Sequence, residues 1–343
     1  MQSGAKEPSY VIGSVAAAGA PVPVVSTRLG WRDRAGGWKV RWDIGRSRYR
    51  VAPGLYAVGK PGADSPVLVT ANYKLTFDAL RRELTGIDAW ILVLDTRGVN
   101  VWCAAGKGTF GTRELERMLL AARLHEVVAH RVLILPQLSA SGVSAPEVKR
   151  DAGWTVRYGP VRASDLPAYL AGNMRKNDAM RKVEFRAADR MTIAPAELAH
   201  AWPFLLATAA ASVLVALPFG AGWLERAAGF GLPLLGAVLV AALVFPALLP
   251  WLPFRAFALK GAVLGAAWSI ASGFAVGDTL PRGLGRGLIM TAMVSFIAMN
   301  FTGSTTFTSQ PGATLEVRRG LAPMIACAFV GVALTATLRI LSL

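Results

Sequence analysis

The chain has 343 residues, of which 53% are hydrophobic and 17% are charged, and its formal net charge is +16. This composition excludes a single ordinary soluble domain and predicts a soluble part joined to a membrane part. The Lys and Arg residues are scattered along the chain and form neither a basic tract nor a known nucleic-acid-binding motif, so we expect no nucleic-acid partner. A surface that faces anionic lipid or an acidic protein explains the charge more simply.

The soluble part begins with a segment that carries no signal for export. Its first apolar stretch, residues 11–25, is rich in Gly, Ala and Pro and has no cationic start, so we predict no signal peptide. We treat residues 1–37 as an N-terminal extension and residues 38–200 as one α/β domain. The soluble part is therefore expected to stay in the cytoplasm.

Strands and helices alternate through the α/β domain. Apolar runs predict strands near 67–69, 90–94, 131–135 and 155–158, and helical spacing predicts helices at 76–84 and 112–124. This alternation predicts a Rossmann-like parallel sheet covered by helices on both faces. Because ligands of such sheets bind beyond the carboxyl ends of the strands, we expect a pocket there.

Cys103 lies in a strand-to-helix crossover, between the buried run 89–95 and a helix that starts at Thr112. A free cysteine is often only a small buried hydrophobe, and that interpretation stays open for Cys103. The other cysteine, Cys327, lies in an apolar run and is most simply a buried apolar residue. Two distant cysteines favour a reducing compartment and exclude a disulfide framework.

Charged residues become sparse at about Pro203, where long apolar runs begin. A bilayer span needs roughly 20 apolar residues. We therefore predict an all-α transmembrane domain, residues 203–343, of about five helices. The expected spans are 203–219, 232–249, 254–276, 288–301 and 321–341.

Six cations between residues 175 and 190 precede the first expected span. By the positive-inside rule they place the soluble domain in the cytoplasm, on the inner membrane of the cell. The loop with Arg282 and Arg286 would then face outward, which partly contradicts the rule. A polar, Gly-containing loop at 300–312 is either a solvated connection between helices or part of the path along which a transferred group would move.

Residues 100–107, with the sequence NVWCAAGK, resemble the signature segment of the HgcA family, the corrinoid proteins of microbial mercury methylation. A related segment occurs in the large subunit of the corrinoid iron-sulfur protein. The resemblance extends, in order, over residues 38–197. It includes the segments 67–78, 133–138, 142–143 and 158–163.

The resemblance implies a corrinoid cofactor, with a cap helix near Cys103 and the Cys103 thiolate as the lower axial ligand of cobalt. Ala104, Ala105 and Gly106 would allow close approach of the ring, although ordinary turn chemistry explains such residues equally well. His125, His130 and His200 lie outside the DxHxxG context of histidine-ligating corrinoid proteins. The other expected cofactor contacts are Asn72, Thr76, Val101, Trp102, Lys107, Thr109, Phe110, Gln137, Leu138, Gly142, Val143, Ser144, Tyr158, Gly159 and Pro160.

The function implied is that of a corrinoid-dependent methyltransferase, which moves a methyl group from methyl-cob(III)amide to inorganic Hg(II) to form methylmercury. Two alternatives stay open: a corrinoid methyl carrier of one-carbon metabolism, and a non-catalytic corrinoid-binding membrane protein. Two cysteines cannot build a four-cysteine cluster, so a separate ferredoxin-like 4Fe-4S reductant, similar to HgcB, is the expected partner. A methyl donor or methyltransferase and the lipid bilayer complete the expected partners.

Overall fold

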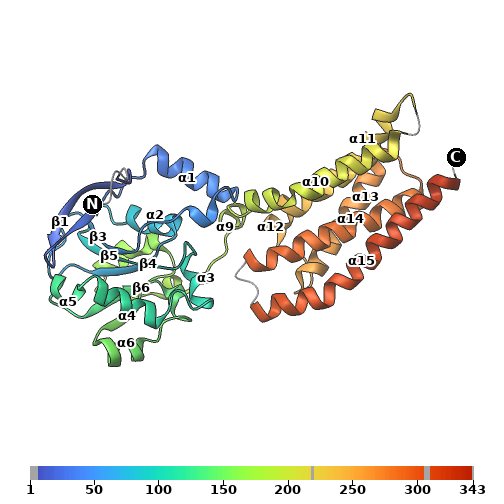
Figure 1. Cartoon of the computed structure of the whole chain (residues 1–343). Helices are drawn as coiled ribbons and strands as arrows, with labels where there is room; N and C mark the ends of the chain where they lie inside the picture. The colour runs from blue at the N-terminus through green and yellow to red at the C-terminus, as the bar shows by residue number, and fades with distance from the viewer. Residues whose placement is uncertain (1–6, 218–219, 305–309, 342–343) are drawn as a thin grey trace. The chain divides into compact units, whose positions relative to one another are not determined.

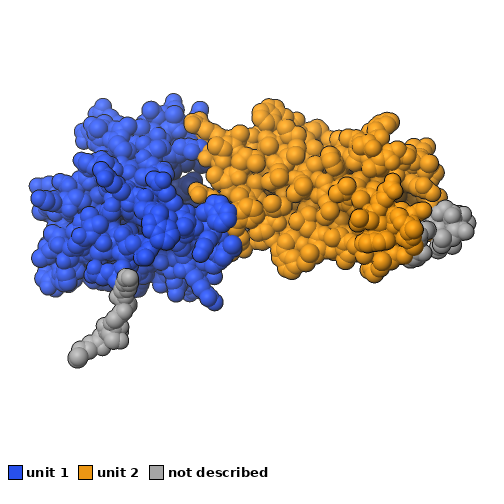
Figure 2. Space-filling model, turned by 90° about the horizontal axis from the view of Figure 1, so that it is seen from above, with its two compact units in different colours: residues 1–40, 44–183 blue, residues 41–43, 184–343 orange. Residues whose placement is uncertain are grey.

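A computed structural model describes residues 7–217, 220–304 and 310–341. The chain divides into two compact units, which Figure 2 shows in different colours. Unit 1 holds residues 1–40 and 44–183, and unit 2 holds residues 41–43 and 184–343. Each unit is described here by itself.

Unit 1 is built on one seven-stranded sheet with the order β1-β2-β3-β5-β4-β6-β7. β4, β5, β6 and β7 run parallel to one another, whereas β3 is antiparallel to β5 and β1 is antiparallel to β2. The strands are β1 (Val11–Ala17), β2 (Ala20–Val25), β3 (Gly54–Val58), β4 (Val67–Ala71), β5 (Ala89–Leu94), β6 (Val132–Leu135) and β7 (Thr155–Tyr158).

The four strands expected from the sequence are therefore confirmed as the parallel half of the sheet. The mixed half was not expected. Residues 11–25, part of the segment treated as an extension, form β1 and β2 and extend the same sheet through β3. The Gly, Ala and Pro content of these residues hides the apolar alternation that normally reveals a strand.

Helices cover both faces of the parallel half of the sheet (Figure 1). In β5, Trp90, Leu92 and Leu94 face one apolar core, while Ile91 and Val93 face the other. The first core also holds residues of α3 (Val101–Gly106), α4 (Thr112–Ala121), α5 (Leu124–Val127) and α6 (Ala145–Ala152). The second holds residues of α2 (Lys74–Arg82) and α7 (Leu166–Ala171).

The remaining elements of unit 1 are short or lie at its edge. α1 (Trp31–Arg41) follows β2, and α8 (Asp178–Arg181) follows α7. Single 3-10 turns occur at η1 (Arg46–Arg48), η2 (Gln137–Ser139) and η3 (Ala163–Asp165).

Unit 2 is helical, and among its described residues five helical stretches are long and apolar enough to cross a membrane. They are residues 187–214, 223–248, 257–276, 280–300 and 312–338, so the expected number of spans agrees with the structure. The helices are α9 (Ala187–Met191), α10 (Ala194–Ala216), α11 (Trp223–Leu239), the π-helical segment η5 (Val240–Val244), α12 (Phe245–Leu248), α13 (Phe257–Val276), α14 (Leu280–Asn300), the 3-10 turn η6 (Phe301–Ser304) and α15 (Gln310–Leu341).

Two buried cations bind free carbonyl groups at the end of α12. Arg190 donates to the carbonyl oxygens of Pro246 and Ala247, and Lys260 donates to those of Leu249 and Leu252. The last carbonyls of a helix have no partner within it, so these side chains take the place of water there. Residues 305–309, in the polar loop singled out from the sequence, lie outside the described residues.

Candidate functional site

The carboxyl ends of β4 and β6 lie side by side, although these strands are separated in sequence by β5. From β4 the chain passes to α2 on one face of the sheet, and from β6 it passes to η2 and α6 toward the other face. Such a divergence of two neighbouring strands opens a crevice at their ends. The sheet therefore has a ligand-binding position between β4 and β6.

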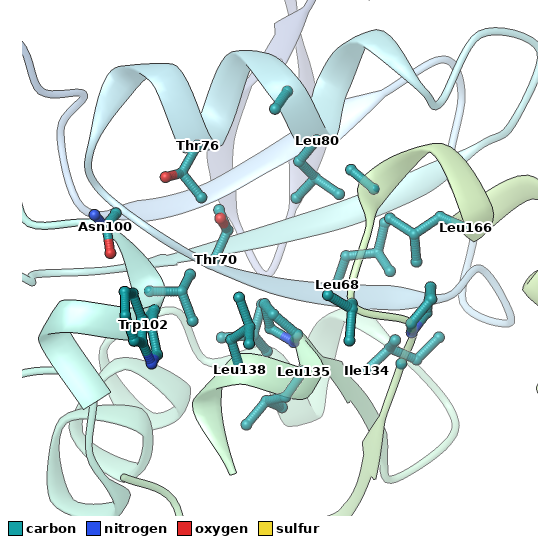
Figure 3. A pocket seen from close by; sticks show the side chains of 18 of the residues that line it. Leu68, Thr70, Thr76, Leu80, Asn100, Trp102, Ile134, Leu135, Leu138 and Leu166 are labelled. Carbon is teal, nitrogen blue, oxygen red and sulfur yellow. The ribbon is translucent and has the colours of Figure 1, made fainter. Parts of the chain in front are cut away.

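A cavity of about 450 Å³ occupies this position (Figure 3). It is bounded by the second half of β4, one face of α2, the start of α3, and the segments that follow β6 and β7. Its polar side chains are those of Thr70, Thr76 and Asn100, and the rest of the lining is mostly apolar. Such a cavity suits an apolar group with a few polar substituents.

Asn100 shapes the start of the short helix α3. Its side-chain oxygen accepts a hydrogen bond from the Cys103 backbone amide at 2.9 Å, which caps the helix. Val101 and Trp102 line the cavity. Cys103 is partly buried one residue further along the helix and is absent from the lining among the described residues.

Asn72, the first residue after β4, holds the loop that leads into α3. Its amide nitrogen donates to Asp95 Oδ1 at 2.9 Å. Its oxygen accepts from the Thr96 hydroxyl at 2.9 Å and from the Gly98 amide at 2.8 Å. The side chain is buried and makes these hydrogen bonds within the protein, so Asn72 holds the loop that leads to α3.

Four expected cofactor contacts face the apolar core instead. Ala104 and Phe110 have no exposed surface, and Ala105 and Val143 are also buried. The small side chains in α3 serve close packing within the protein: a Cβ atom on Gly142 would lie 2.3 Å from the Phe110 carbonyl oxygen and 2.9 Å from the Ala105 Cα atom. The sequence motif thus fixes how α3 packs on the segment after η2.

Other expected contacts also bind within the protein. Gln137 accepts a hydrogen bond from Lys176, and burial together with the nearby Arg181 holds the pKa of Lys176 below its usual value. The Tyr158 hydroxyl donates a hydrogen bond to the Val143 carbonyl oxygen, and burial raises the pKa of Tyr158. The Ser144 amide donates to the Thr112 hydroxyl, so Thr112 joins two segments and does not cap its own helix.

The structure brings six of the expected residues together around the cavity: Thr76, Val101, Trp102, Leu138, Gly159 and Pro160. Gly106 and Lys107 are exposed at the end of α3, and the partly buried Thr109 follows them. Sequence reasoning missed Thr70, Asn100 and the α2 side chains Leu75, Ala79 and Leu80. The three α2 residues follow the end of a strand at the spacing i, i+4 and i+5, which places them on one helix face; this pattern could have identified them from the sequence.

A large, flat cofactor with apolar and amide-bearing edges is compatible with these residues. The cavity offers an apolar recess with three polar side chains, and the exposed end of α3 beside it carries glycine at positions 106 and 108 with open space around each. Among the described residues, no cluster of three or more His, Cys, Asp or Glu residues could hold a metal ion. Cys103 is the soft donor nearest to the cavity-lining part of α3.

Part of unit 1 is similar to known proteins. Residues 44–170 match the family model described as the CO dehydrogenase/acetyl-CoA synthase delta subunit. The match includes β3 to β7 and therefore every segment that lines the cavity.

Similar proteins include gamma subunits of the acetyl-CoA decarbonylase/synthase complex. The one from Archaeoglobus fulgidus is 34% identical over 130 residues, and the one from Methanopyrus kandleri is 35% identical over 127 residues. These alignments cover 37% and 36% of this chain, respectively, and 27% of each relative. The chain thus shares about a quarter of the length of these relatives.

Proposed function

We propose that unit 1 binds a corrinoid and serves as a methyl carrier in one-carbon metabolism. The observation that carries this proposal is the coincidence of two results: the family match to residues 44–170 and a cavity at the β4–β6 crevice built from that same segment. The similar proteins are subunits of the acetyl-CoA decarbonylase/synthase complex, which associates the matched segment with acetyl-CoA chemistry.

A bound corrinoid would supply cobalt that accepts and releases a methyl group. The residues of this chain would bind and orient it: the apolar cavity takes up part of the cofactor, while Asn72 and Asn100 fix the loop and the start of α3. Cys103, held on this helix, would supply the thiolate that binds the cobalt. A thiolate suits a transition metal, and the electron density it donates would favour release of a methyl group.

Corrinoid binding is tested with the full chain in detergent. We expect the purified protein to take up added cobalamin in a stoichiometric amount, with spectra that show no coordination by the cofactor's own base or by histidine. An absence of uptake would refute the proposal. Binding without methyl transfer to any acceptor would favour the non-catalytic corrinoid-binding protein.

A second candidate acceptor is inorganic Hg(II), which would make the protein a corrinoid-dependent mercury methyltransferase. The observation that favours it is Cys103 on a capped helix beside the cavity, in a chain that continues into five membrane-compatible helices. Protein loaded with methyl-cobalt corrinoid and mixed with Hg(II) should yield methylmercury. If methyl transfer occurs only to the acceptors of acetyl-CoA chemistry, the mercury function is wrong and the methyl carrier remains.

Reduction of cobalt requires a low-potential electron donor. The chain has two cysteines, so we propose a separate ferredoxin-like 4Fe-4S protein, similar to HgcB, as reductant, together with a methyl donor or methyltransferase. We place the protein in the inner membrane of the cell with unit 1 in the cytoplasm.

A further inference from the structure

The helix α1 packs on unit 1 through one narrow stripe. Asp33, Gly36, Gly37 and Val40 follow the i, i+3, i+4, i+7 spacing of a single helix face. Asp33, Gly37 and Val40 are buried, and a Cβ atom on Gly36 would lie 2.6 Å from the Tyr49 hydroxyl oxygen. This face therefore belongs to the interior of unit 1.

Buried ion pairs fix α1 to α2. Lys74 Nζ lies 2.7 Å from Asp33 Oδ1 and 2.7 Å from Asp78 Oδ2. Arg81 completes the network through Asp33 and Asp78, both at 2.8 Å. All four side chains are buried, and each cation pairs with both carboxylates. These ion pairs therefore fix which face of α1 is turned toward α2.

This orientation of α1 directs a different stripe outward. Trp31, Arg34, Trp38 and Arg41 follow the spacing i, i+3, i+7, i+10, so indoles and guanidinium groups alternate along one face. Trp31 is 74% exposed and Trp38 is 61% exposed. The surface of a soluble protein rarely has two such highly exposed indole rings on one helix.

The same region is strongly cationic. Residues 28–50 contain eight Lys and Arg residues, all exposed, and two Asp residues, of which Asp33 is buried in the ion-pair network. Ile44, after the helix, is 59% exposed. Indole rings favour the headgroup level of a bilayer, and Lys and Arg side chains are attracted to anionic lipids.

We propose that α1 and the following residues to Arg50 form a surface that binds the headgroup region of an anionic membrane. The indoles of Trp31 and Trp38 enter the boundary between headgroups and acyl chains, and the surrounding cations neutralise lipid phosphates. An acidic protein would use the charge, but a bilayer also covers the alternating indoles and Ile44. This proposal does not depend on corrinoid binding.

The experiment compares hydrogen exchange of the full chain in nanodiscs of phosphatidylcholine with exchange in nanodiscs that also contain phosphatidylglycerol. We expect the amides of residues 28–50 to exchange about tenfold more slowly in the anionic discs, and high salt to remove most of this difference. Equal exchange in the two kinds of disc would overturn the proposal. Slowing that requires an added acidic protein or a nucleic acid would overturn it as well and identify that partner instead.

Two variants separate specific binding from total charge. One replaces Arg32, Arg34, Lys39 and Arg46 by Gln and should lose the protection. The matched control replaces four exposed cations elsewhere in unit 1, and it should retain the protection: Lys60, Arg113, Lys149 and Arg157, each to Gln. Equal loss in both would show a general charge effect and overturn the proposal.

A third variant tests the apolar part of the contact. Trp31 is mostly exposed and makes a ring contact with Arg32, so Trp31→Ser should leave the fold intact. Protection in anionic discs should fall severalfold at unchanged charge. Full protection in this variant would refute insertion of the indole.

Discussion

At the scale of single residues, the site is organised by side chains that hold backbone in place. Asn100 caps α3, and Asn72 binds the loop before this helix. Asn72 directly follows β4, and Asn100 directly precedes α3; both elements line the cavity. Cys103 is a free, partly buried cysteine on the helix that these side chains hold. Its proposed role depends on the helix being fixed before a cofactor binds.

The first prediction concerns Cys103. Cys103→Ala should bind corrinoid nearly as well as the parent protein, because many contacts hold the cofactor, but it should lose methyl transfer to Hg(II). Cys103→His should retain part of the transfer, because imidazole also ligates cobalt. Methylmercury yield and Co(III) spectra of the variants are the measurements. Full activity of Cys103→Ala would return Cys103 to the role of a small buried hydrophobe.

The second prediction concerns Asn72. Asn72→Ala should weaken corrinoid binding and lower the thermal stability of unit 1, because the Gly98 amide loses its buried acceptor, which costs about 1–3 kcal/mol for a group left unpaired. Asn72→Asp keeps the acceptor oxygens but puts a second buried carboxylate beside Asp95, so it should also lower stability at neutral pH, and acidification should relieve part of this loss. If Asn72→Ala lowers neither stability nor affinity, the loop does not depend on this residue.

At the scale of elements, α1 and α2 behave as one piece because their buried ions pair with each other. Burial acts to raise the pKa of Asp33, but hydrogen bonds and charge from Lys74 and Arg81 outweigh it, so the pKa lies below the ordinary value of 3.8. The ionised form is thus favoured by folding. This contribution to stability is present above pH 3.8 and is lost as the pH falls through the lower pKa of the folded state.

The third prediction follows from this sign. Asp33→Asn should lower the midpoint temperature for unfolding of unit 1 at neutral pH, because removal of one partner of a buried ion network costs about 3–5 kcal/mol. The difference from the parent protein should shrink below pH 3.8, where the parent also loses the charge. Thermal melts followed by circular dichroism over this pH range provide the measurement. A difference that stays constant with pH would show that the Asp33 charge does not stabilise the fold.

At the scale of the whole molecule, a unit with an α/β sheet is joined in one chain to a helical unit with five membrane-compatible helices. Five cations between residues 175 and 186 precede the first of these helical stretches, which begins at residue 187. On the basis of the positive-inside rule, we propose that unit 1 lies on the cytoplasmic side.

The fourth prediction tests this orientation. A single cysteine introduced as Lys60→Cys, an exposed position of unit 1, in a background without Cys103 and Cys327, should react with a membrane-impermeant maleimide in inverted vesicles. Intact spheroplasts should show no labelling until they are permeabilised. Labelling of intact spheroplasts would place unit 1 outside the cytoplasm and contradict the proposed location.

The sequence by itself determined the parallel strands, the helices between them and the five apolar helices, because each depends on periodicity or composition within a short stretch of chain. Only the tertiary structure decided that Asn72 binds its own protein, that Ala104 and Phe110 face the core, and that α1 turns Trp31 and Trp38 outward. Partners such as Asp33 and Arg81 lie 48 residues apart. Which polar groups a side chain meets depends on such distant approaches, and no local pattern records them.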